Sequence, residues 1–412
     1  MSFNEWFFDL QTRTAGQAGA GLPAFRALLS RLHNPQNNYK IIHVAGTNGK
    51  GTVCTLLTRT LTCAGYRTGL FVSPHLISPI ERLQVNGVEI TPKDFEHAVQ
   101  TVCAAQTEPL NFFELLTAAA FVYFAKQQVQ YVVLETGLGG RKDPTNVCMP
   151  VLSVITSIGL DHTQLLGSTL AQIAGEKAGI IKYGVPVLCG DAPAQAAKVV
   201  EQTALDKQAP LTWVKEGCPF YEYAYDFINE MTVLYTAEHQ EWNLHLLGHK
   251  QTQNACIVYQ AAKQLGVSEQ VIKTAFETVA LPGRFERIKR GNTTFILDGA
   301  HNPQAVQSLM NFWQKTPYQL QDATLLCGFM KDKDFTQMLT LLIPHFRRII
   351  ITVPPSERAA RQTDFGALLD ASNVTFEPDY TTALAQATQT SVVLCTGSFY
   401  LVGVVRGIIY EK

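Results

Sequence analysis

The chain has 412 residues, of which 46% are apolar and 16% are charged, a composition typical of a globular protein and not of a disordered one. This length leaves room for two or three domains with buried cores. The formal net charge of −1 argues against nonspecific binding to nucleic acid or to an anionic membrane surface. No apolar run is long enough to span a membrane, and the N-terminus lacks the basic residues of a signal peptide.

The nine cysteines are scattered along the chain, and no two of them form a C-x-x-C pair. An odd number of cysteines with this spacing fits neither a disulfide framework nor a zinc knuckle. We therefore expect a cytoplasmic protein with reduced thiols that binds neither nucleic acid nor a membrane.

The first half of the chain alternates short β-branched runs with helical stretches, which predicts a parallel sheet with helices on both faces. The pair Asn86-Gly87 favours a tight hairpin turn, because both residues tolerate positive φ. We expect strands at residues 39–44, 67–72, 131–135 and 151–157, a hairpin over 83–90, and helices at 52–64, 112–128 and 170–181.

The loop Gly46-Thr47-Asn48-Gly49-Lys50-Gly51-Thr52 joins the first strand to the first of these helices. Glycines let backbone N–H groups surround a phosphate, Lys50 adds a positive charge, and the Thr52 hydroxyl can ligate magnesium. The usual phosphate-loop motif places Ser or Thr directly after the lysine, so the intervening Gly51 departs from it. A simple Gly-Lys turn is the alternative interpretation.

Two polar positions follow later strands of this domain. Glu135 closes an apolar strand and precedes several glycines, a place where a carboxylate holds magnesium or orients water, although a surface glutamate is the alternative. His162 follows the next strand. A lone histidine is more often structural, but its place at a strand end of the same domain favours a metal ligand, although imidazole suits zinc or copper better than magnesium. Lys177 lies within a predicted helix, and its spacing alone favours a solvent-exposed side chain.

The character of the sequence changes at residues 210–247, where aromatic and β-branched residues alternate with polar ones. This pattern predicts antiparallel strands appended to the first domain. Helices at 251–265 and 268–279 follow, and then strands at 294–297, 324–327, 348–353 and 392–395 with helices between them. The expected organisation is a P-loop-type α/β domain with a small antiparallel subdomain (1–283), a linker (284–292) and a smaller Rossmann-like α/β domain (293–412).

In this second domain, Asp298-Gly299-Ala300-His301-Asn302-Pro303 follows a strand. Asp298 and His301 could contact ribose, phosphate or an incoming substrate there. In the alternative interpretation, Asp298 and Asn302 only cap and turn the chain. Pro303 is well placed for the first turn of a helix.

Several of these runs together resemble the folylpolyglutamate synthase and dihydrofolate synthase family, which is the folate branch of the Mur ligases. The additional Gly51 is a feature of that branch. The similarity covers nearly the whole chain in the order of the family. The matching runs are residues 46–52, 73–76, 81–82, 135–146, 155–162, 176–182, 282–285, 298–303 and 396–400.

The resemblance implies an ATP-dependent ligase that activates a carboxylate as an acyl phosphate, which the amine of L-glutamate then attacks. It also implies two magnesium ions and a Lys177 side chain that carbon dioxide converts to a carbamate. This role for Lys177 replaces the solvent-exposed side chain that its spacing alone favours. Lys50, Lys177 and His301 are the expected catalytic residues. The implied ATP ligands, clasping the nucleotide between the domains, are Thr47, Asn48, Gly49, Lys50, Gly51, Thr52, Asn254, Arg284 and Asp298; the implied metal ligands are Thr52, Ser73, Glu135, His162 and Lys177.

The acceptor site maps less tightly, onto Phe112, Phe113, Glu114, Lys142, Asp143 and Pro144. Many bifunctional bacterial members read Leu-Asp-Ala where this chain reads Lys142-Asp143-Pro144, and the proline removes an N–H and stiffens the loop. We therefore predict a folylpolyglutamate synthase that acts on reduced folates and works as a monomer. A bifunctional enzyme that also accepts dihydropteroate is the close alternative, and a P-loop ATPase switch or a folate-binding module are more distant ones.

Overall fold

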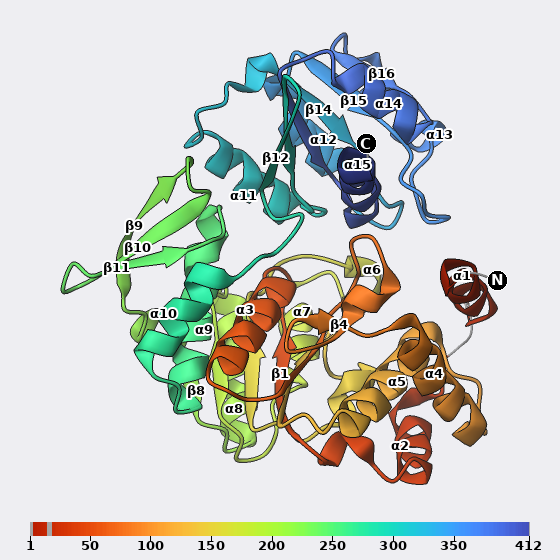
Figure 1. The fold of residues 1–412 in the computed structure, drawn as a ribbon, viewed down its shortest axis with the longest axis vertical. Helices are drawn as coiled ribbons and strands as arrows, with labels where there is room; N and C mark the ends of the chain where they lie inside the picture. Colours follow the sequence, from red (N-terminus) through yellow and green to blue (C-terminus); the bar gives the residue numbers. More distant parts are fainter. Residues whose placement is uncertain (1–2, 15–18, 412) are drawn as a thin grey trace. The chain divides into compact units, whose positions relative to one another are not determined.

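The computed structural model describes residues 3–14 and 19–411, which form two compact units (Figure 1). The first unit comprises the chain up to Pro219 together with Gln253–Val279. The second comprises Phe220–Thr252 and the chain from Ala280 onward. The chain therefore passes between the units three times.

The sheet of the first unit has eight strands in the order β4-β3-β2-β5-β1-β6-β7-β8. The six strands from β2 to β8 in this order are parallel, and β3 and β4 extend the edge as an antiparallel hairpin. The first strand is thus central, and the loop that follows it leaves at a topological switch point, where ligands bind in open α/β sheets. The strands are β1 (Lys40–Ala45), β2 (Thr68–Phe71), β3 (Leu83–Val85), β4 (Val88–Glu89), β5 (Tyr131–Glu135), β6 (Leu152–Ile155), β7 (Val187–Cys189) and β8 (Leu211–Trp213).

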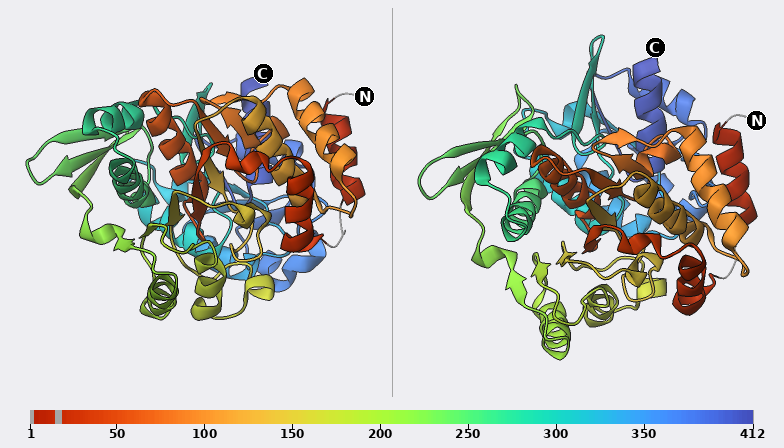
Figure 2. Two further views of the ribbon diagram at one scale, coloured as in Figure 1. Left: turned by 90° about the horizontal axis from the view of Figure 1, so that it is seen from below. Right: turned by 60° about the horizontal axis from the view of Figure 1, so that its bottom comes forward.

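Helices cover both faces of this sheet, as the views of Figure 2 show. Side chains alternate along β1, so Ile41, His43 and Ala45 point to the same face of the sheet. On this face Ile41 packs in the core with residues of α5, and Ala45 packs in a second core with residues of α7 and α8. Helix α3 contacts β1, β2 and β5 and packs against α10. The helices are α1 (Phe3–Thr14), α2 (Gly21–Arg31), α3 (Lys50–Cys63), α4 (Pro92–Ala105), α5 (Phe112–Lys126), α6 (Thr163–Leu166), α7 (Leu170–Ala178), α8 (Ala194–Asp206), α9 (His249–Gln264) and α10 (Glu269–Thr278).

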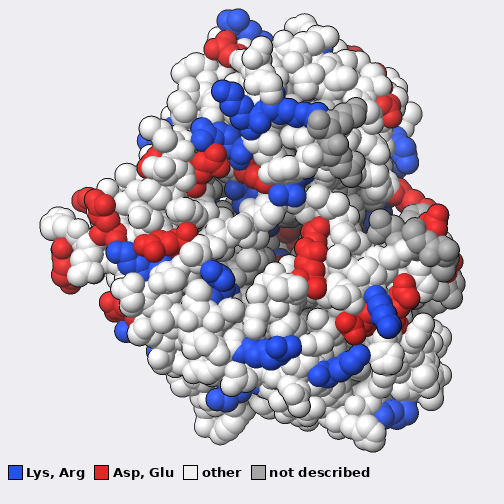
Figure 3. Space-filling model, in the orientation of Figure 1, with Lys and Arg blue, Asp and Glu red and all other residues white. Residues whose placement is uncertain are grey.

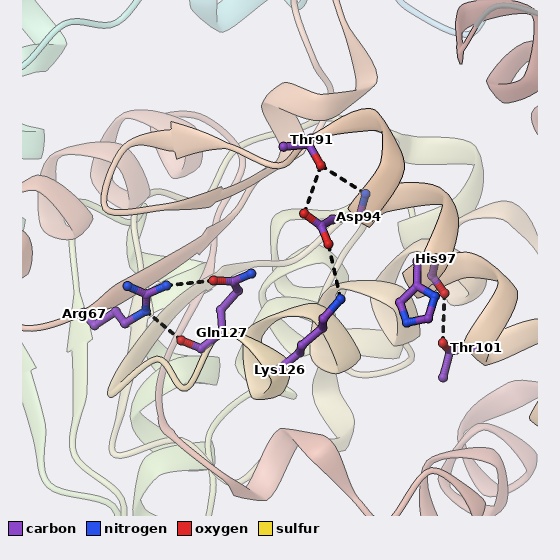
Figure 4. A network of polar contacts seen from close by, with 7 residues as sticks. All are labelled: Arg67, Thr91, Asp94, His97, Thr101, Lys126 and Gln127. Atoms are coloured by element: carbon purple, nitrogen blue, oxygen red, sulfur yellow. Dashed lines mark hydrogen bonds and ion pairs between the residues drawn. The ribbon is translucent and has the colours of Figure 1, made fainter.

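Helices α4 and α5 pack side by side, with a polar network at their exposed surface (Figure 4). The Thr91 hydroxyl accepts the Asp94 N–H at 3.1 Å and caps α4, and Lys126 of α5 pairs with Asp94 at 3.3 Å. An exposed ion pair of this kind contributes at most about 1 kcal/mol. The packing of the two helices therefore rests on buried side chains such as Phe95 and Phe121.

The antiparallel sheet has three strands, β9 (Phe220–Asp226), β10 (Met231–Thr236) and β11 (Glu241–Leu244). It groups with the second unit, whereas the sequence predicted that it belongs to the first. The reason is aromatic packing, because the ring centroids of Tyr225 and Phe227 lie 4.7 and 6.1 Å from that of Phe312. Residues 211–213, which were expected in this subdomain, instead form β8 of the large sheet.

The second unit has a six-stranded sheet in the order β12-β13-β17-β14-β15-β16, parallel except for β12. The expected linker 284–292 is wrong, because β12 (Glu286–Arg290) pairs with β13 (Thr293–Leu297) across a turn in which Gly291 has φ +58°. The expected α/β fold class is confirmed. The other elements are β14 (Ala323–Cys327), β15 (Arg348–Ile351), β16 (Val374–Phe376), β17 (Val392–Thr396), α11 (Pro303–Trp313), α12 (Phe335–Leu342), α13 (Gln362–Phe365), α14 (Tyr380–Ala387) and α15 (Phe399–Glu411).

A disulfide joins Cys218 to Cys256, with the two Cα atoms 5.1 Å apart. The prediction that all thiols are reduced is therefore wrong for this pair, while the other seven cysteines are not part of a disulfide. The fold brings the segment before β9 beside α9, where Gln260 also donates a hydrogen bond to the carbonyl of Val214. The partners are 38 residues apart in the sequence, a separation that no short motif reveals.

Acidic and basic side chains are interspersed over most of the face drawn in Figure 3, and several basic side chains lie next to one another in its upper part. Within residues 3–14 and 19–411, no helix has both the length and the apolar character needed to cross a membrane.

Candidate functional site

The loop between β1 and α3 has the geometry of a phosphate-binding loop. β1 ends at Ala45 and α3 begins at Lys50, with Gly49 as its N-cap in the left-handed region at φ +86°. A Cβ on Gly49 would lie 2.5 Å from Oδ1 of Asn254, so glycine permits this close approach. The loop therefore leads directly into the N-terminus of a long helix, where N–H groups and the helix dipole favour an anion. Asn254, expected to contact ATP, lies beside it.

The loop is anchored to the segment that follows β6. Thr47 donates its N–H to the Ser157 carbonyl at 2.8 Å, and its hydroxyl lies 3.1 Å from the Gly159 carbonyl oxygen. The hydroxyls of Thr156 and Ser157 donate to the Asn48 carbonyl at 2.7 and 3.0 Å. These anchors fix the loop before any ligand is bound. Thr156, Ser157 and Gly159 belong to the run 155–162 that resembles the family, but none of the three was predicted as a site residue.

Two lysine ammonium groups converge on one backbone oxygen of this loop. Nζ of Lys50 lies 3.0 Å and Nζ of Lys177 lies 2.8 Å from the carbonyl oxygen of Gly46. Lys177, on α7, is only 4% exposed, so the interpretation of its spacing as a solvent-exposed lysine is wrong. The arrangement concentrates positive charge at the carboxyl end of the central strand.

Three of the predicted metal ligands have oxygen donors in this region. Glu135 ends β5 and is 3% exposed, and its Oε2 accepts the backbone N–H of Ser73, just after β2, at 3.2 Å. Thr52 lies buried in the first turn of α3. These oxygens suit magnesium. In the ranges that the structure describes, no three His, Cys, Asp or Glu residues cluster as a metal site, so phosphate oxygens would have to complete the shell.

His162 takes the left-handed conformation at φ +49° immediately before α6. Its backbone N–H is bonded to the Asp161 carboxylate at 2.9 Å. The residue thus lies at the turn after β6 that the sequence indicated, and its role as a metal ligand stays a prediction.

A second loop, Gly137–Val147, packs on the helix that carries Lys177. A Cβ on Gly140 would lie 2.9 Å from the Glu176 carbonyl oxygen and 3.0 Å from that of Lys177. Arg141 donates its N–H to the Glu176 carbonyl at 2.7 Å. The consecutive glycines at 139 and 140 are the sequence signal for this close approach. Arg141 was not among the predicted site residues, and no local pattern indicates its contact with Glu176.

Two acidic residues proposed for the acceptor site are buried, with backbone donors on their carboxylates. Asp143 accepts the N–H groups of Leu138 at 2.9 Å and Thr145 at 3.0 Å, and burial raises its pKa. The Glu114 carboxylate accepts three N–H groups, from Ala20, Gly21 and Asn111, at 3.0–3.1 Å. Both side chains shape the loops around them, and their contact with a folate stays a prediction.

The remaining acceptor-site candidates differ in exposure. Lys142 is exposed in the Gly137–Val147 loop, and Pro144 opens the short 3₁₀ helix Pro144–Val147. The Phe113 ring lies against Gly137 and 5.8 Å from the ring of Phe71. Phe112 lies at the start of α5, with the Arg82 guanidinium 5.8 Å from its ring. Among the charged residues predicted for the acceptor site, Lys142 is exposed, whereas Glu114 and Asp143 are buried.

The second unit has its own group of polar residues after β13. The Asp298 carboxylate accepts the N–H groups of Phe285 and Ala300, each at 2.9 Å. Burial raises its pKa, and the nearby Arg284 guanidinium, 4.5 Å from the Phe399 ring, opposes this shift. Asp298 therefore turns the chain, as the structural alternative predicted, while it places a carboxylate beside a cation.

His301 and Asn302 follow at the same edge. His301 Nδ1 lies 2.8 Å from the Gly299 carbonyl oxygen, which can only accept, so Nδ1 carries the hydrogen and Nε2 of the neutral ring is an acceptor. The Asn302 side chain accepts the Ala305 N–H at 2.9 Å and caps α11, which confirms its capping role.

Two histidines, the fully buried His43 and the half-buried His75, predict how stability depends on pH. Burial lowers the pKa of both His43 and His75 to about 3, from 6.5 in an unfolded chain. Below pH 6.5 the unfolded chain binds protons that the folded protein cannot, so acidification lowers the free energy of unfolding. Each histidine contributes up to about 1.4 kcal/mol per pH unit. The free energy of unfolding, measured with urea at several pH values between 7.5 and 5, should fall less steeply with decreasing pH for His43→Gln than for the unchanged protein. An equal dependence on pH would contradict the lowered pKa of His43.

Comparisons with known proteins agree with this arrangement. Residues 44–262 match the Mur ligase middle domain, and residues 283–399 match the Mur ligase glutamate ligase domain. The chain is 33% identical over 407 residues to the dihydrofolate synthase/folylpolyglutamate synthase of Bacillus subtilis, covering 94% of each chain.

Two solved structures share the fold over nearly their whole length. The folylpolyglutamate synthase of Mycobacterium tuberculosis, complexed with ADP and AMPPCP, has a TM-score of 0.91 and 26% identity, with 100% of both chains covered. The bifunctional folylpolyglutamate synthase/dihydrofolate synthase of Yersinia pestis, complexed with AMPPNP and a Mn ion, has a TM-score of 0.84 and 27% identity, covering 100% of this chain and 98% of that one. The matches to both Mur ligase domains and to a relative over 94% of the chain show that this protein belongs to the folylpolyglutamate synthase/dihydrofolate synthase family of Mur ligases.

Proposed function

We propose that the chain is an ATP-dependent ligase that joins L-glutamate to the γ-carboxylate of a reduced folate through an acyl phosphate. The observation that carries this proposal is the convergence of Lys50 and Lys177 on the Gly46 carbonyl. The positive charge of Lys50 beside a helix N-terminus, at the end of a central parallel strand, suits the phosphates of a nucleotide. The substrate class comes from the names of the relatives, which are folylpolyglutamate and dihydrofolate synthases.

The reaction has two steps, because a carboxylate is a poor acyl donor. An oxygen of the folate carboxylate attacks the γ-phosphorus of ATP, and ADP leaves with the electron pair of the broken bond. The amine of L-glutamate then attacks the acyl carbon, and phosphate leaves as the amide forms. Lys50 offsets charge on the transferring phosphoryl group, and the anchored loop around Gly46 and Thr47 orients the phosphates.

The oxygen donors of Thr52, Ser73 and Glu135 fit magnesium, and we include His162 and Lys177 in a set that holds two ions. The Yersinia structure, which is complexed with AMPPNP and a Mn ion, supports the use of a divalent metal together with a nucleotide. Magnesium supplies further stabilisation of the charge on the phosphoryl group when it is bound. In this proposal the neutral Lys177 amine adds carbon dioxide, releasing a proton and forming an anionic carbamate. Its remaining N–H can still donate to the Gly46 carbonyl.

The second unit contributes groups for the nucleotide and for the incoming amine. Arg284 and Asp298, with Asn254 of the first unit, are the proposed nucleotide contacts. The hydrogen bond from His301 Nδ1 to Gly299 leaves Nε2 as the basic nitrogen of the neutral ring. That nitrogen can take the proton that the glutamate amine loses as it attacks. We expect the enzyme to act as a monomer in the cytoplasm.

A bifunctional enzyme that also joins dihydropteroate and L-glutamate is the second candidate. The Bacillus relative carries both activities in its name, which favours this possibility. The stiffening proline at 144, beside the exposed Lys142, is the local difference from the usual sequence of bifunctional members.

Turnover of the purified protein tests these alternatives. ADP release and incorporation of labelled glutamate are measured with ATP and magnesium, and with either tetrahydrofolate or dihydropteroate as acceptor. We expect glutamate-dependent ADP release and a labelled product with the reduced folate. A product from both acceptors identifies the bifunctional enzyme. Equal ADP release without glutamate, and no product from either acceptor, would instead indicate an ATPase switch.

A further inference from the structure

A chain of hydrogen bonds runs beneath the Gly137–Val147 loop, away from the lysines and oxygens that serve ATP. His43 Nε2 lies 2.8 Å from the Thr145 hydroxyl, and this hydroxyl donates to Oδ1 of Asp143 at 2.5 Å. His43 and Thr145 are fully buried, and Asp143 is 4% exposed. His43 and Thr145 are 102 residues apart, so the contact is a feature of the fold.

The hydrogens in this chain can be assigned. Thr145 has a single hydroxyl hydrogen, and it is directed to the Asp143 carboxylate. The Thr145 oxygen must therefore accept from His43, whose Nε2 carries the hydrogen and whose Nδ1 is a bare acceptor. In the part of the chain that the structure describes, this Nδ1 is buried without a hydrogen-bond partner. An apolar side chain would avoid that cost, so the bond to Thr145 is the evident reason for a histidine in an otherwise apolar strand.

This series of hydrogen bonds connects two segments of the first unit, the phosphate loop and the Gly137–Val147 loop. His43 lies on β1, three residues before Gly46 of the phosphate loop. Asp143 ties the two ends of the other loop together, because Oδ2 accepts the Leu138 N–H and Oδ1 accepts the Thr145 N–H. The same loop carries the exposed Lys142 between these anchors.

We propose that His43 and Thr145 are positioning residues that fix the Gly137–Val147 loop on β1 and thereby place Lys142 for the folate acceptor. This inference rests on the proposed function only for the identity of the acceptor. The hydrogen bonds transmit no chemistry themselves. They determine where the loop lies relative to the strand that ends in the phosphate loop, and a small displacement of a substrate-positioning group costs catalytic efficiency.

Thr145→Val keeps the shape of the side chain and removes the hydroxyl, and Thr145→Ser is its matched control because the hydroxyl is kept. We expect Thr145→Val to raise the KM for tetrahydrofolate about tenfold, with the KM for ATP changed less than about threefold. Thr145→Ser should stay within about threefold of the unchanged enzyme. His43→Leu should behave like Thr145→Val, and His43→Gln, which keeps an N–H donor near the position of Nε2, should retain most of the affinity.

The double variant His43→Leu/Thr145→Val should be no worse than Thr145→Val alone, because both changes remove the same bond. A lower Tm with both KM values unchanged would overturn the positioning role. Hydrogen–deuterium exchange of residues 137–147 provides a readout that needs no turnover. We expect the amides of this loop to exchange faster in His43→Leu and in Thr145→Val than in the unchanged enzyme, while those of α4 exchange at the same rate. Equal exchange of the loop would overturn the inference, whether or not the enzyme uses a folate. Failure of the unchanged enzyme with every folate would overturn the proposed function alone.

Discussion

Replacing Lys50 by alanine should lower kcat for glutamate-dependent ADP release by about 100- to 1,000-fold. The Lys50 ammonium lies 3.0 Å from the Gly46 carbonyl oxygen and 3.3 Å from that of Thr47, at the mouth of the loop. We expect phosphate oxygens to replace these two carbonyl acceptors when a nucleotide binds, so that the Lys50 charge offsets the charge on the phosphoryl group as it transfers. The alanine variant keeps the loop but loses that charge, and the acyl phosphate should not accumulate.

The stability of the Lys50→Ala variant should change little, because the residue is half-buried at the first position of α3 and alanine favours a helix. Lys40→Ala is a matched control, since Lys40 is exposed at the opposite end of β1. Its kcat should equal that of the unchanged enzyme. A Lys50→Ala enzyme with a kcat within threefold of normal, and an unchanged Tm, would contradict the role of this lysine.

The phosphate loop could be predicted from the sequence because all of its determinants are contiguous. A β-branched strand, glycines and a helix follow one another within a short stretch, and local conformation decides the result. The hairpin at Asn86-Gly87 is a similar case, with φ of +53° and +79° in the structure. Where the chain must approach itself closely, glycine is the visible trace, as at Gly140 against α7.

Contacts between distant segments could not be predicted in the same way. The spacing of Lys177 in its helix says nothing of the Gly46 carbonyl, which is 131 residues away. Cys218 and Cys256 carry no motif, and they meet only because the segment before β9 lies beside α9. Alternation along β9 predicted a strand, but the packing of Tyr225 on Phe312 decides which unit receives it. In each case the deciding partner lies outside any local window.

The Gly137–Val147 loop and the phosphate loop (residues 46–52) are held in place by different sets of contacts. The phosphate loop is held mainly by backbone and hydroxyl groups of the segment after β6, and it is pre-formed. The second loop is held by side chains, through Asp143, Thr145 and His43, and also by the backbone bond from Arg141 to Glu176. Side-chain anchors can be exchanged without altering the strand order.

Lys177→Ala should lower kcat at least about 100-fold, because it removes both the hydrogen bond to the Gly46 carbonyl and the amine that carries the proposed carbamate. Acetate or formate should restore part of the activity if a carboxylate is the working group. Lys177→Gln separates the two roles, since it keeps an N–H donor toward the Gly46 carbonyl but cannot add carbon dioxide. We expect this variant to be as inactive as Lys177→Ala and to keep a Tm closer to that of the unchanged enzyme.

A carbamate can also be observed directly. Enzyme equilibrated with ¹³C-labelled bicarbonate should give a carbamate signal in the ¹³C NMR spectrum, which both Lys177 variants should lack. Near-normal activity of Lys177→Ala without additives would refute the carbamate. Full activity of Lys177→Gln would assign the function of this residue to its hydrogen bond with Gly46, which is the contact that the structure shows. The positive charge of Lys177 would then be dispensable, and magnesium would need its anionic ligands from Glu135 and the phosphates alone.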